Sequence, residues 1–120
     1  MSEKTKESKI KSEKRRLKNK YKDLPLDTLA VLEGLLDEAA FMRVELEDMK
    51  KDMIINGRVE LFSQSDKMEP YERERPVVRQ YTQMMRNYQN ALKLLDDKLP
   101  KTDPKPKQES DGFEEFVNGV

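Results

Sequence analysis

The chain has 120 residues, of which 35% are hydrophobic and 40% are charged, so a packed core along its whole length is not expected. It has no Cys and no His, which excludes disulfides, thiolate metal sites and the commonest general base. No apolar run is long enough to span a bilayer, and the N-terminus has no signal-peptide core, so we expect a cytoplasmic protein. Together these features predict a core in the middle of the chain and solvated ends.

The net charge of zero conceals a basic N-terminal segment. Residues 1–22 contain 10 basic and 3 acidic side chains, whereas residues 23–100 contain 11 basic and 16 acidic ones. Because hydrophobic residues are few there, residues 1–23 are expected to form a disordered arm, or a helix only on binding. The predicted contacts to DNA phosphates are Lys9, Lys11, Lys14, Arg15, Arg16, Lys18, Lys20 and Lys22. A solubility tail or a targeting peptide is the competing interpretation.

Residues 24–100 are predicted to form an all-α core, an antiparallel hairpin of two long amphipathic helices. The first helix is expected over about residues 26–55, because apolar residues recur there at steps of three and four and Asn56-Gly57 supplies a stop. The second is expected over about residues 77–99. The polar connector between them could hold a short strand at Val59–Phe62.

Two helices alone bury little apolar surface, so the sequence favours association with further copies of the chain as a closed dimer or a ring. The stripe residues expected at contacts between copies are Leu29, Leu32, Leu36, Met42, Leu46, Met49, Met53, Tyr81, Met85, Tyr88, Leu92 and Leu95. The alternative is that the connector or the arms cover the second apolar face of the first helix, formed by Val31, Leu35, Phe41 and Val44.

The sequence offers little for catalysis. The four Gly are isolated, so no phosphate-binding loop is present, and the carboxylates have no His or Cys beside them. Asp48 and Asp52 lie one helical turn apart and could touch a divalent cation, but a solvated polar face is the favoured interpretation. We therefore predict no enzyme activity, no metal, no cofactor and no small-molecule substrate.

The C-terminal residues differ from the core. Residues 101–111 contain two Pro and no hydrophobic residue, which is typical of a linker. In residues 112–120, Phe113, Phe116 and Val117 lie at helical spacing among acidic residues, which favours a docking tail for a partner groove. A frayed end with scattered hydrophobic residues is the alternative.

The stretch from Leu24 to Pro100 resembles the terminase small subunits of temperate phages of Gram-positive bacteria. The pieces that carry the resemblance are Leu24-Pro25-Leu26-Asp27, Asn56-Gly57, Glu72 to Pro76 with Val77 and Tyr81, Leu95 to Pro100, and the acidic tail Asp111 to Val117. The resemblance implies binding of double-stranded viral DNA in the bacterial cytoplasm, a homo-oligomer that could be a ring, and recruitment or regulation of the large ATPase–nuclease subunit. A helix-turn-helix, which small terminases of other phage groups carry, is not found.

Two other functions remain open at this point. A coiled-coil structural or adaptor protein that binds only other proteins would share the helical hairpin but would have no affinity for DNA. A transcription regulator would need a recognition helix on a compact domain, and neither expected helix has that character. The adaptor is therefore the stronger of the two alternatives.

Overall fold

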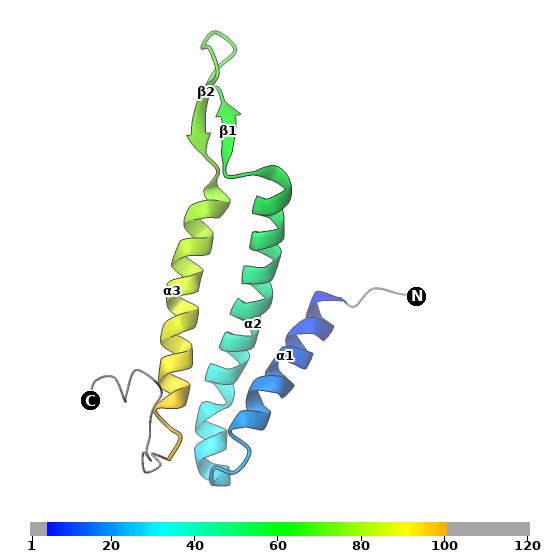
Figure 1. Ribbon diagram of the computed structural model, residues 1–120, viewed down its shortest axis with the longest axis vertical. Coiled ribbons are helices and arrows are strands. Elements are labelled where there is room, and N and C mark those ends of the chain that lie inside the picture. Colours follow the sequence, from blue (N-terminus) through cyan, green and yellow to red (C-terminus); the bar gives the residue numbers. More distant parts are fainter. Residues whose placement is uncertain (1–4, 101–120) are drawn as a thin grey trace, which may run out of the picture.

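The computed structural model describes residues 5–100, and about 70% of that part is helical. The elements in chain order are α1 (Lys6–Lys20), α2 (Leu26–Asn56), β1 (Val59–Phe62), β2 (Tyr71–Glu74) and α3 (Pro76–Asp96). Helices α2 and α3 lie side by side and antiparallel, and α1 packs against α2 (Figure 1). The expected predominance of helix is confirmed. No helix in this part of the chain has the length and apolar character needed to cross a membrane.

The two long helices adjoin the hairpin at a glycine and a proline of the sequence. Gly57 ends α2 with a positive φ of 81°, and its N–H donates to the Met53 carbonyl at 2.8 Å. Glycine suits this position because a side chain disfavours positive φ. Pro76 occupies the first turn of α3, where its missing N–H costs no hydrogen bond. Helix α3 ends at Asp96, three residues before the predicted end, because the Lys98 and Leu99 N–H groups donate to carbonyls three residues back and tighten the chain into a turn.

The connector between α2 and α3 is a β-hairpin. Val59–Phe62 forms the predicted strand, and Tyr71–Glu74 pairs with it in antiparallel register, Val59 opposite Glu74 and Phe62 opposite Tyr71. The hairpin extends beyond the adjoining ends of the long helices (Figure 1). Its base is closed by the Arg75 N–H, which donates to the Arg58 carbonyl at 2.8 Å.

The prediction of a disordered arm is wrong for residues 6–20. The Thr5 hydroxyl oxygen caps α1 by accepting the Ser8 N–H at 3.0 Å. The apolar residues of the segment, Ile10, Leu17 and Tyr21, follow one another at steps of seven and four and so share one face of the helix. Leu17 and Tyr21 are buried in the core. A stripe too narrow to form a core alone suffices to dock a helix onto a surface that the rest of the chain supplies.

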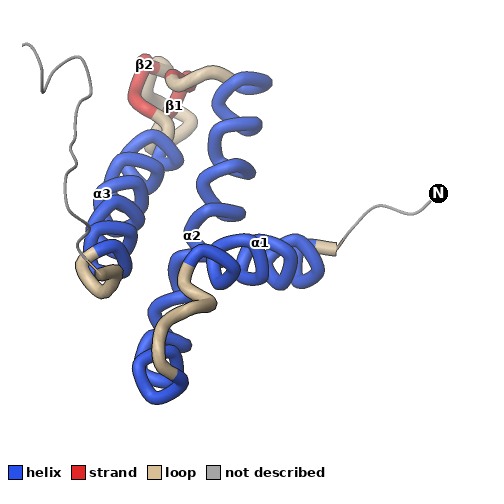
Figure 2. Tube along the Cα trace, turned by 60° about the horizontal axis from the view of Figure 1, so that its bottom comes forward, coloured by secondary structure: helices blue, strands red, loops and turns tan. Residues whose placement is uncertain are grey.

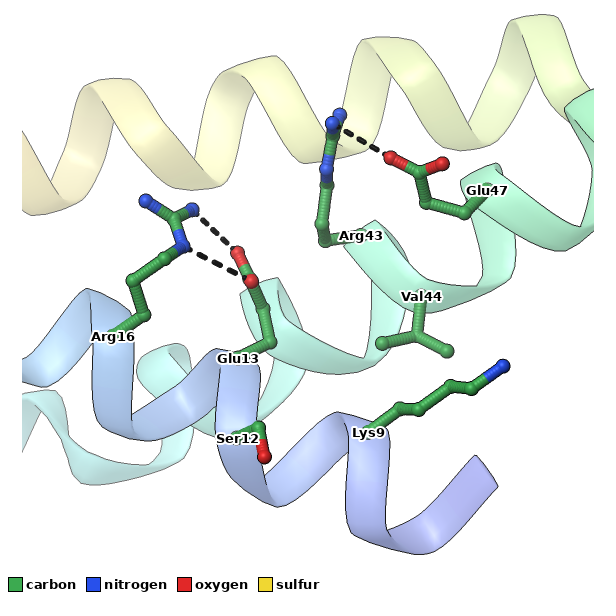
Figure 3. Close-up of a pocket in the computed structure, with 7 residues that line it drawn as sticks. All are labelled: Lys9, Ser12, Glu13, Arg16, Arg43, Val44 and Glu47. Atoms are coloured by element: carbon green, nitrogen blue, oxygen red, sulfur yellow. Dashed lines mark hydrogen bonds and ion pairs between the residues drawn. The ribbon is translucent and has the colours of Figure 1, made fainter. Parts of the chain in front are cut away.

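The arm thereby covers part of the second face of α2, and coverage by the arms was the alternative to oligomerisation. Figure 2 shows α1 crossing α2 on the side away from α3, so α2 is the central helix. Val44, part of the second apolar face, is buried, and Figure 3 places it beside Lys9 and Ser12 of α1. Val31 and Phe41 stay exposed.

Most of the stripe predicted to join copies builds the core of a single chain instead. Five of its members are buried within the chain, namely Leu32, Leu36, Leu46, Tyr88 and Leu95. Five others are half-buried and pack against this core, namely Leu29, Met42, Tyr81, Met85 and Leu92. Met49 and Met53, farther along α2, are half-buried outside it. With a third helix present, these side chains find partners inside one chain, so the stripe is no longer a free surface.

Candidate nucleic-acid interface

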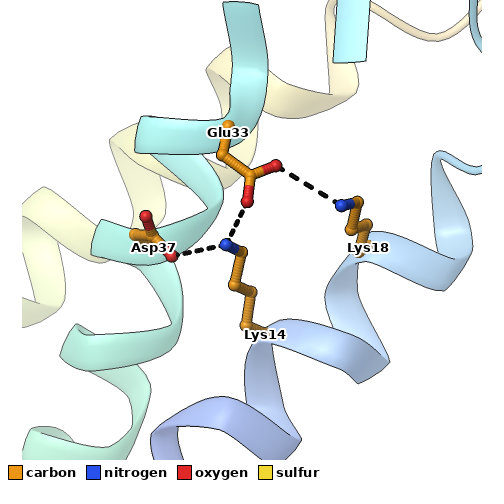
Figure 4. A network of polar contacts seen from close by, with 4 residues as sticks. All are labelled: Lys14, Lys18, Glu33 and Asp37. Atoms are coloured by element: carbon orange, nitrogen blue, oxygen red, sulfur yellow. Dashed lines mark hydrogen bonds and ion pairs between the residues drawn. The ribbon is translucent and has the colours of Figure 1, made fainter. Parts of the chain in front are cut away.

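The basic side chains of α1 fall into two groups with different surroundings. The first group points toward the body of the protein and meets carboxylates of α2. The Lys14 ammonium lies between Glu33 and Asp37, 2.8 Å from the Asp37 carboxylate, and Lys18 reaches Glu33 at 3.4 Å (Figure 4). The hydrogen bond that the Lys14 ammonium donates to Asp37, and then the one to Glu33, raise the pKa of Lys14.

Further ion pairs fasten both ends of α1. At its start, Lys6 lies 2.5 Å from Glu45 and 3.2 Å from Asp48. At its end, Lys20 reaches Asp96 of α3 at 3.3 Å. Because these pairs are exposed to water, each adds little stability, and the apolar side chains contribute more to docking. The ion pairs set the orientation of α1.

Tyr21 links α1 to the end of α3. Its ring is 1% exposed, and its hydroxyl donates to the Asp96 carboxylate at 2.9 Å. Burial, and then the hydrogen bond to Asp96, raise the pKa of Tyr21 to about 12. The phenol is therefore neutral and remains a hydrogen-bond donor throughout the physiological range. Sequence reasoning missed this contact, although the seven-and-four spacing of Ile10, Leu17 and Tyr21 signalled it.

The second group of α1 cations faces solvent. Lys9, Lys11, Arg15 and Lys22 are exposed and form no ion pair with any residue of the described part, 5–100. Lys11 and Arg15 are one turn apart on α1, and Lys22 is exposed in the turn that follows the helix. We call Lys11, Arg15 and Lys22 the outer basic row.

Of the eight predicted DNA contacts, four are therefore engaged elsewhere. Lys14, Lys18 and Lys20 meet carboxylates of α2 and α3, and Arg16 pairs within α1 with Glu13 at 2.6 Å. The remaining four are the outer basic row and Lys9. Only packing separates the inward cations of this segment from its outward ones.

A shallow groove of about 410 Å³ runs between α1 and α2. Its lining is shown in Figure 3: Lys9, Ser12, Glu13, Arg16, Arg43, Val44 and Glu47. Arg16 is paired with Glu13, and Arg43 with Glu47 at 2.7 Å, while Lys9 contributes a positive charge that no carboxylate of residues 5–100 neutralises. The groove thus carries a small positive excess.

Arg73 and Arg75, just before α3, are engaged in contacts within the chain. Arg75 donates to both Asp52 carboxylate oxygens at 3.0 Å and to the Gly57 carbonyl at 2.7 Å, tying α2 to α3. Arg73 pairs with Glu60 at 2.7 Å. With Asp52 on Arg75 and Asp48 on Lys6, the two carboxylates considered for a cation are each bound to a basic side chain. Residues 5–100 contain no cluster of three or more potential metal ligands.

A scan against protein-family models found no match, and neither did searches of curated proteins and of solved structures. The function is therefore inferred from the geometry of the chain. The predicted linker, residues 101–111, and the predicted docking tail, residues 112–120 with Phe113, Phe116 and Val117, lie outside the described residues.

Proposed function

We propose that this protein is the non-catalytic small subunit of a phage DNA-packaging terminase, acting in the cytoplasm of the bacterial host. In this role it binds double-stranded viral DNA, associates with copies of itself and recruits or regulates the large ATPase–nuclease subunit. The observation that carries the proposal is the outer basic row, a set of exposed cations on the docked helix and in the turn after it that pair with no carboxylate of residues 5–100. The helix and turn outline from Leu24 to Pro100 supports the choice among DNA-binding proteins.

The docked helix is suited to sequence-independent contact with DNA. Phosphates are read by charge, and their neutralisation releases counterions, so binding weakens as salt rises. Holding Lys11 and Arg15 on a docked helix, with Lys22 in the turn after it, reduces the ordering entropy that a disordered arm would lose on binding. The inward lysines contribute indirectly, since their ion pairs with α2 orient the outer face.

The proposed function assigns recruitment of the large subunit to Phe113, Phe116 and Val117. Three apolar side chains at helical spacing form a short stripe that fits a groove on a partner. The linker before them would give the stripe reach. No catalytic role is assigned to this chain, which has neither His nor Cys.

Fluorescence anisotropy with a labelled random-sequence DNA duplex, titrated at several salt concentrations, tests the DNA-binding role. The triple variant Lys11→Ala, Arg15→Ala, Lys22→Ala should bind more weakly at low salt. The slope of log affinity against log salt should fall by about 0.9 for each phosphate that the variant no longer neutralises, so by nearly three in total.

The matched control removes three positive charges that lie outside α1. Lys50, Lys51 and Lys67 are exposed and lie on the last turns of α2 and in the hairpin loop. The triple alanine variant at these positions should keep nearly the whole slope. Equal losses of DNA affinity in both triple variants would mean that binding depends on the net charge of the protein. The assignment of the DNA interface to α1 would then be wrong.

The second candidate function is an adaptor that binds only proteins. Exposed apolar side chains at the hairpin end of the molecule, among them Ile54, Ile55 and Leu61, favour it. It predicts no anisotropy change with DNA at any salt concentration, so the same titration separates the two functions.

A further inference from the structure

The β-hairpin has little support from its own chain. Its two strands pair with each other, and no further strand within residues 5–100 joins either edge. Each strand therefore presents one outer edge of backbone groups that no other strand of this part of the chain pairs. An isolated two-stranded hairpin is marginally stable in water, and open edges accept additional strands.

On one face of the hairpin, the side chains contact each other. Glu60 pairs with Arg73 opposite it at 2.7 Å. The Arg73 guanidinium also lies 3.6 Å from the centre of the Phe62 ring, and Tyr71 meets the edge of Phe62 with the rings 5.9 Å apart. The other face carries Val59 and Leu61, which alternate with Glu60 and Phe62 along β1. Leu61 is 72% exposed, although it is the most central apolar residue of that face.

The two edges differ in how well they resist pairing. The β2 edge lies between Pro70 and Pro76 and carries Glu72 and Glu74. Two β2 strands paired antiparallel about Arg73 would place Glu72 opposite Glu74, which is repulsive. The β1 edge has neither proline nor lysine, and its one charged residue, Glu60, is already neutralised by Arg73. Edges without such protection are those that pair with other chains.

We propose that the β1 edge is a self-association surface, on which β1 of a second copy pairs antiparallel to form a continuous four-stranded sheet. A two-fold axis through Leu61 sets Leu61 against its equivalent and Glu60 against Phe62. An axis through Glu60 would oppose two glutamates. Pairing about Leu61 therefore uses most of the β1 strand and places no two like charges opposite each other.

The exposed side chains Ile54 and Ile55, on the last turn of α2 at the same end of the molecule, add apolar surface beside the new sheet. A four-residue strand pair buries less than the roughly 1,200 Å² of a stable complex, so this contact alone gives a weak, concentration-dependent dimer. The inference deepens the homo-oligomer of the proposed function, on which it rests, and places its contact on the hairpin instead of the helical stripes.

Sedimentation velocity of the full chain over a wide concentration range tests the surface. The wild type should shift from monomer toward dimer as concentration rises. Leu61→Glu should weaken dimerisation at least about tenfold, because two like charges would be opposed at the axis. The matched control is Leu26→Glu, a leucine that is 84% exposed at the start of α2, and it should dimerise like the wild type.

Crosslinking tests the register. The chain has no native cysteine, so Leu61→Cys should form a symmetric intermolecular disulfide, because residues directly opposed in an antiparallel pair lie within bonding distance. Val59→Cys would face Ser63 of the second copy and should crosslink far more slowly. Equal crosslinking of both variants would overturn the register.

A chain that stays monomeric at all concentrations overturns the proposal. The β1 edge would then be open to an extended segment of another protein. A dimer that Leu61→Glu does not weaken overturns it too, because the contact would then lie on another surface. Measuring the DNA affinity of Leu61→Glu at low salt keeps this test apart from the proposed function. Retained DNA binding by a wild type that forms no dimer refutes the hairpin contact alone.

Discussion

Replacing Tyr21 with Phe removes the hydroxyl that joins α1 to α3. In the folded protein this hydroxyl donates to the Asp96 carboxylate at 2.9 Å from a ring that is almost wholly buried. A hydrogen bond to a charged acceptor contributes about 1.5–3 kcal/mol. Because the Asp96 side chain is 55% exposed and regains water in the variant, we expect a loss near the lower end, about 1–1.5 kcal/mol at neutral pH.

The same substitution should change the response to alkaline pH. The pKa of Tyr21 rises from 10.0 to about 12 on folding, so its contribution is complete below pH 10 and is lost as pH rises through 12. A difference of two pKa units corresponds to about 3 kcal/mol. Tyr21→Phe lacks this titration, so the variant is less stable than the wild type at neutral pH and overtakes it at about pH 11, where the wild type has lost about 1.4 kcal/mol.

Urea unfolding followed by far-ultraviolet circular dichroism, at a series of pH values, measures both effects. The phenolate absorbance of the folded protein supplies an independent check, since its highest-pH transition should vanish in the variant. Stability curves that stay parallel across the alkaline range would refute the reasoning, because the Tyr21 pKa would then be the same in the folded and unfolded chains.

Two further substitutions test the contacts around α1 and at the base of the hairpin. Leu17→Ala leaves a cavity under α1 and should cost about 2–4 kcal/mol in urea unfolding, with faster hydrogen exchange across α1; exchange unchanged from the wild type would mean that α1 docks without it. Asp52→Asn should reduce the amount by which the free energy of unfolding falls as the pH becomes acidic. The hydrogen bond from Asn56, and then that from Arg75, lower the pKa of Asp52, so its contribution is present above pH 3.8 and disappears as pH falls through the lowered value. Acid unfolding curves that coincide for variant and wild type would contradict this.

The sequence alone determined the parts of this protein that depend on local chemistry. Apolar residues at helical spacing and the Asn56-Gly57 stop predicted α2 nearly to the residue, and alternation at Val59–Phe62 predicted β1. These features can be predicted from short segments, because helix period, strand alternation and positive φ involve residues close together in the chain. The positive charge of the N-terminal segment was equally plain.

Only the tertiary structure decided whether that segment folds and which of its cations face outward. Ile10, Leu17 and Tyr21 are too few to form a core, and their burial depends on α2 and on Asp96, 75 residues away from Tyr21. Docking also takes Lys14 into ion pairs with α2 and leaves Arg15, the next residue, in solvent. Neighbours in sequence acquire opposite roles because a helix turns about 100° per residue, and the packed face is chosen by the surface that it meets.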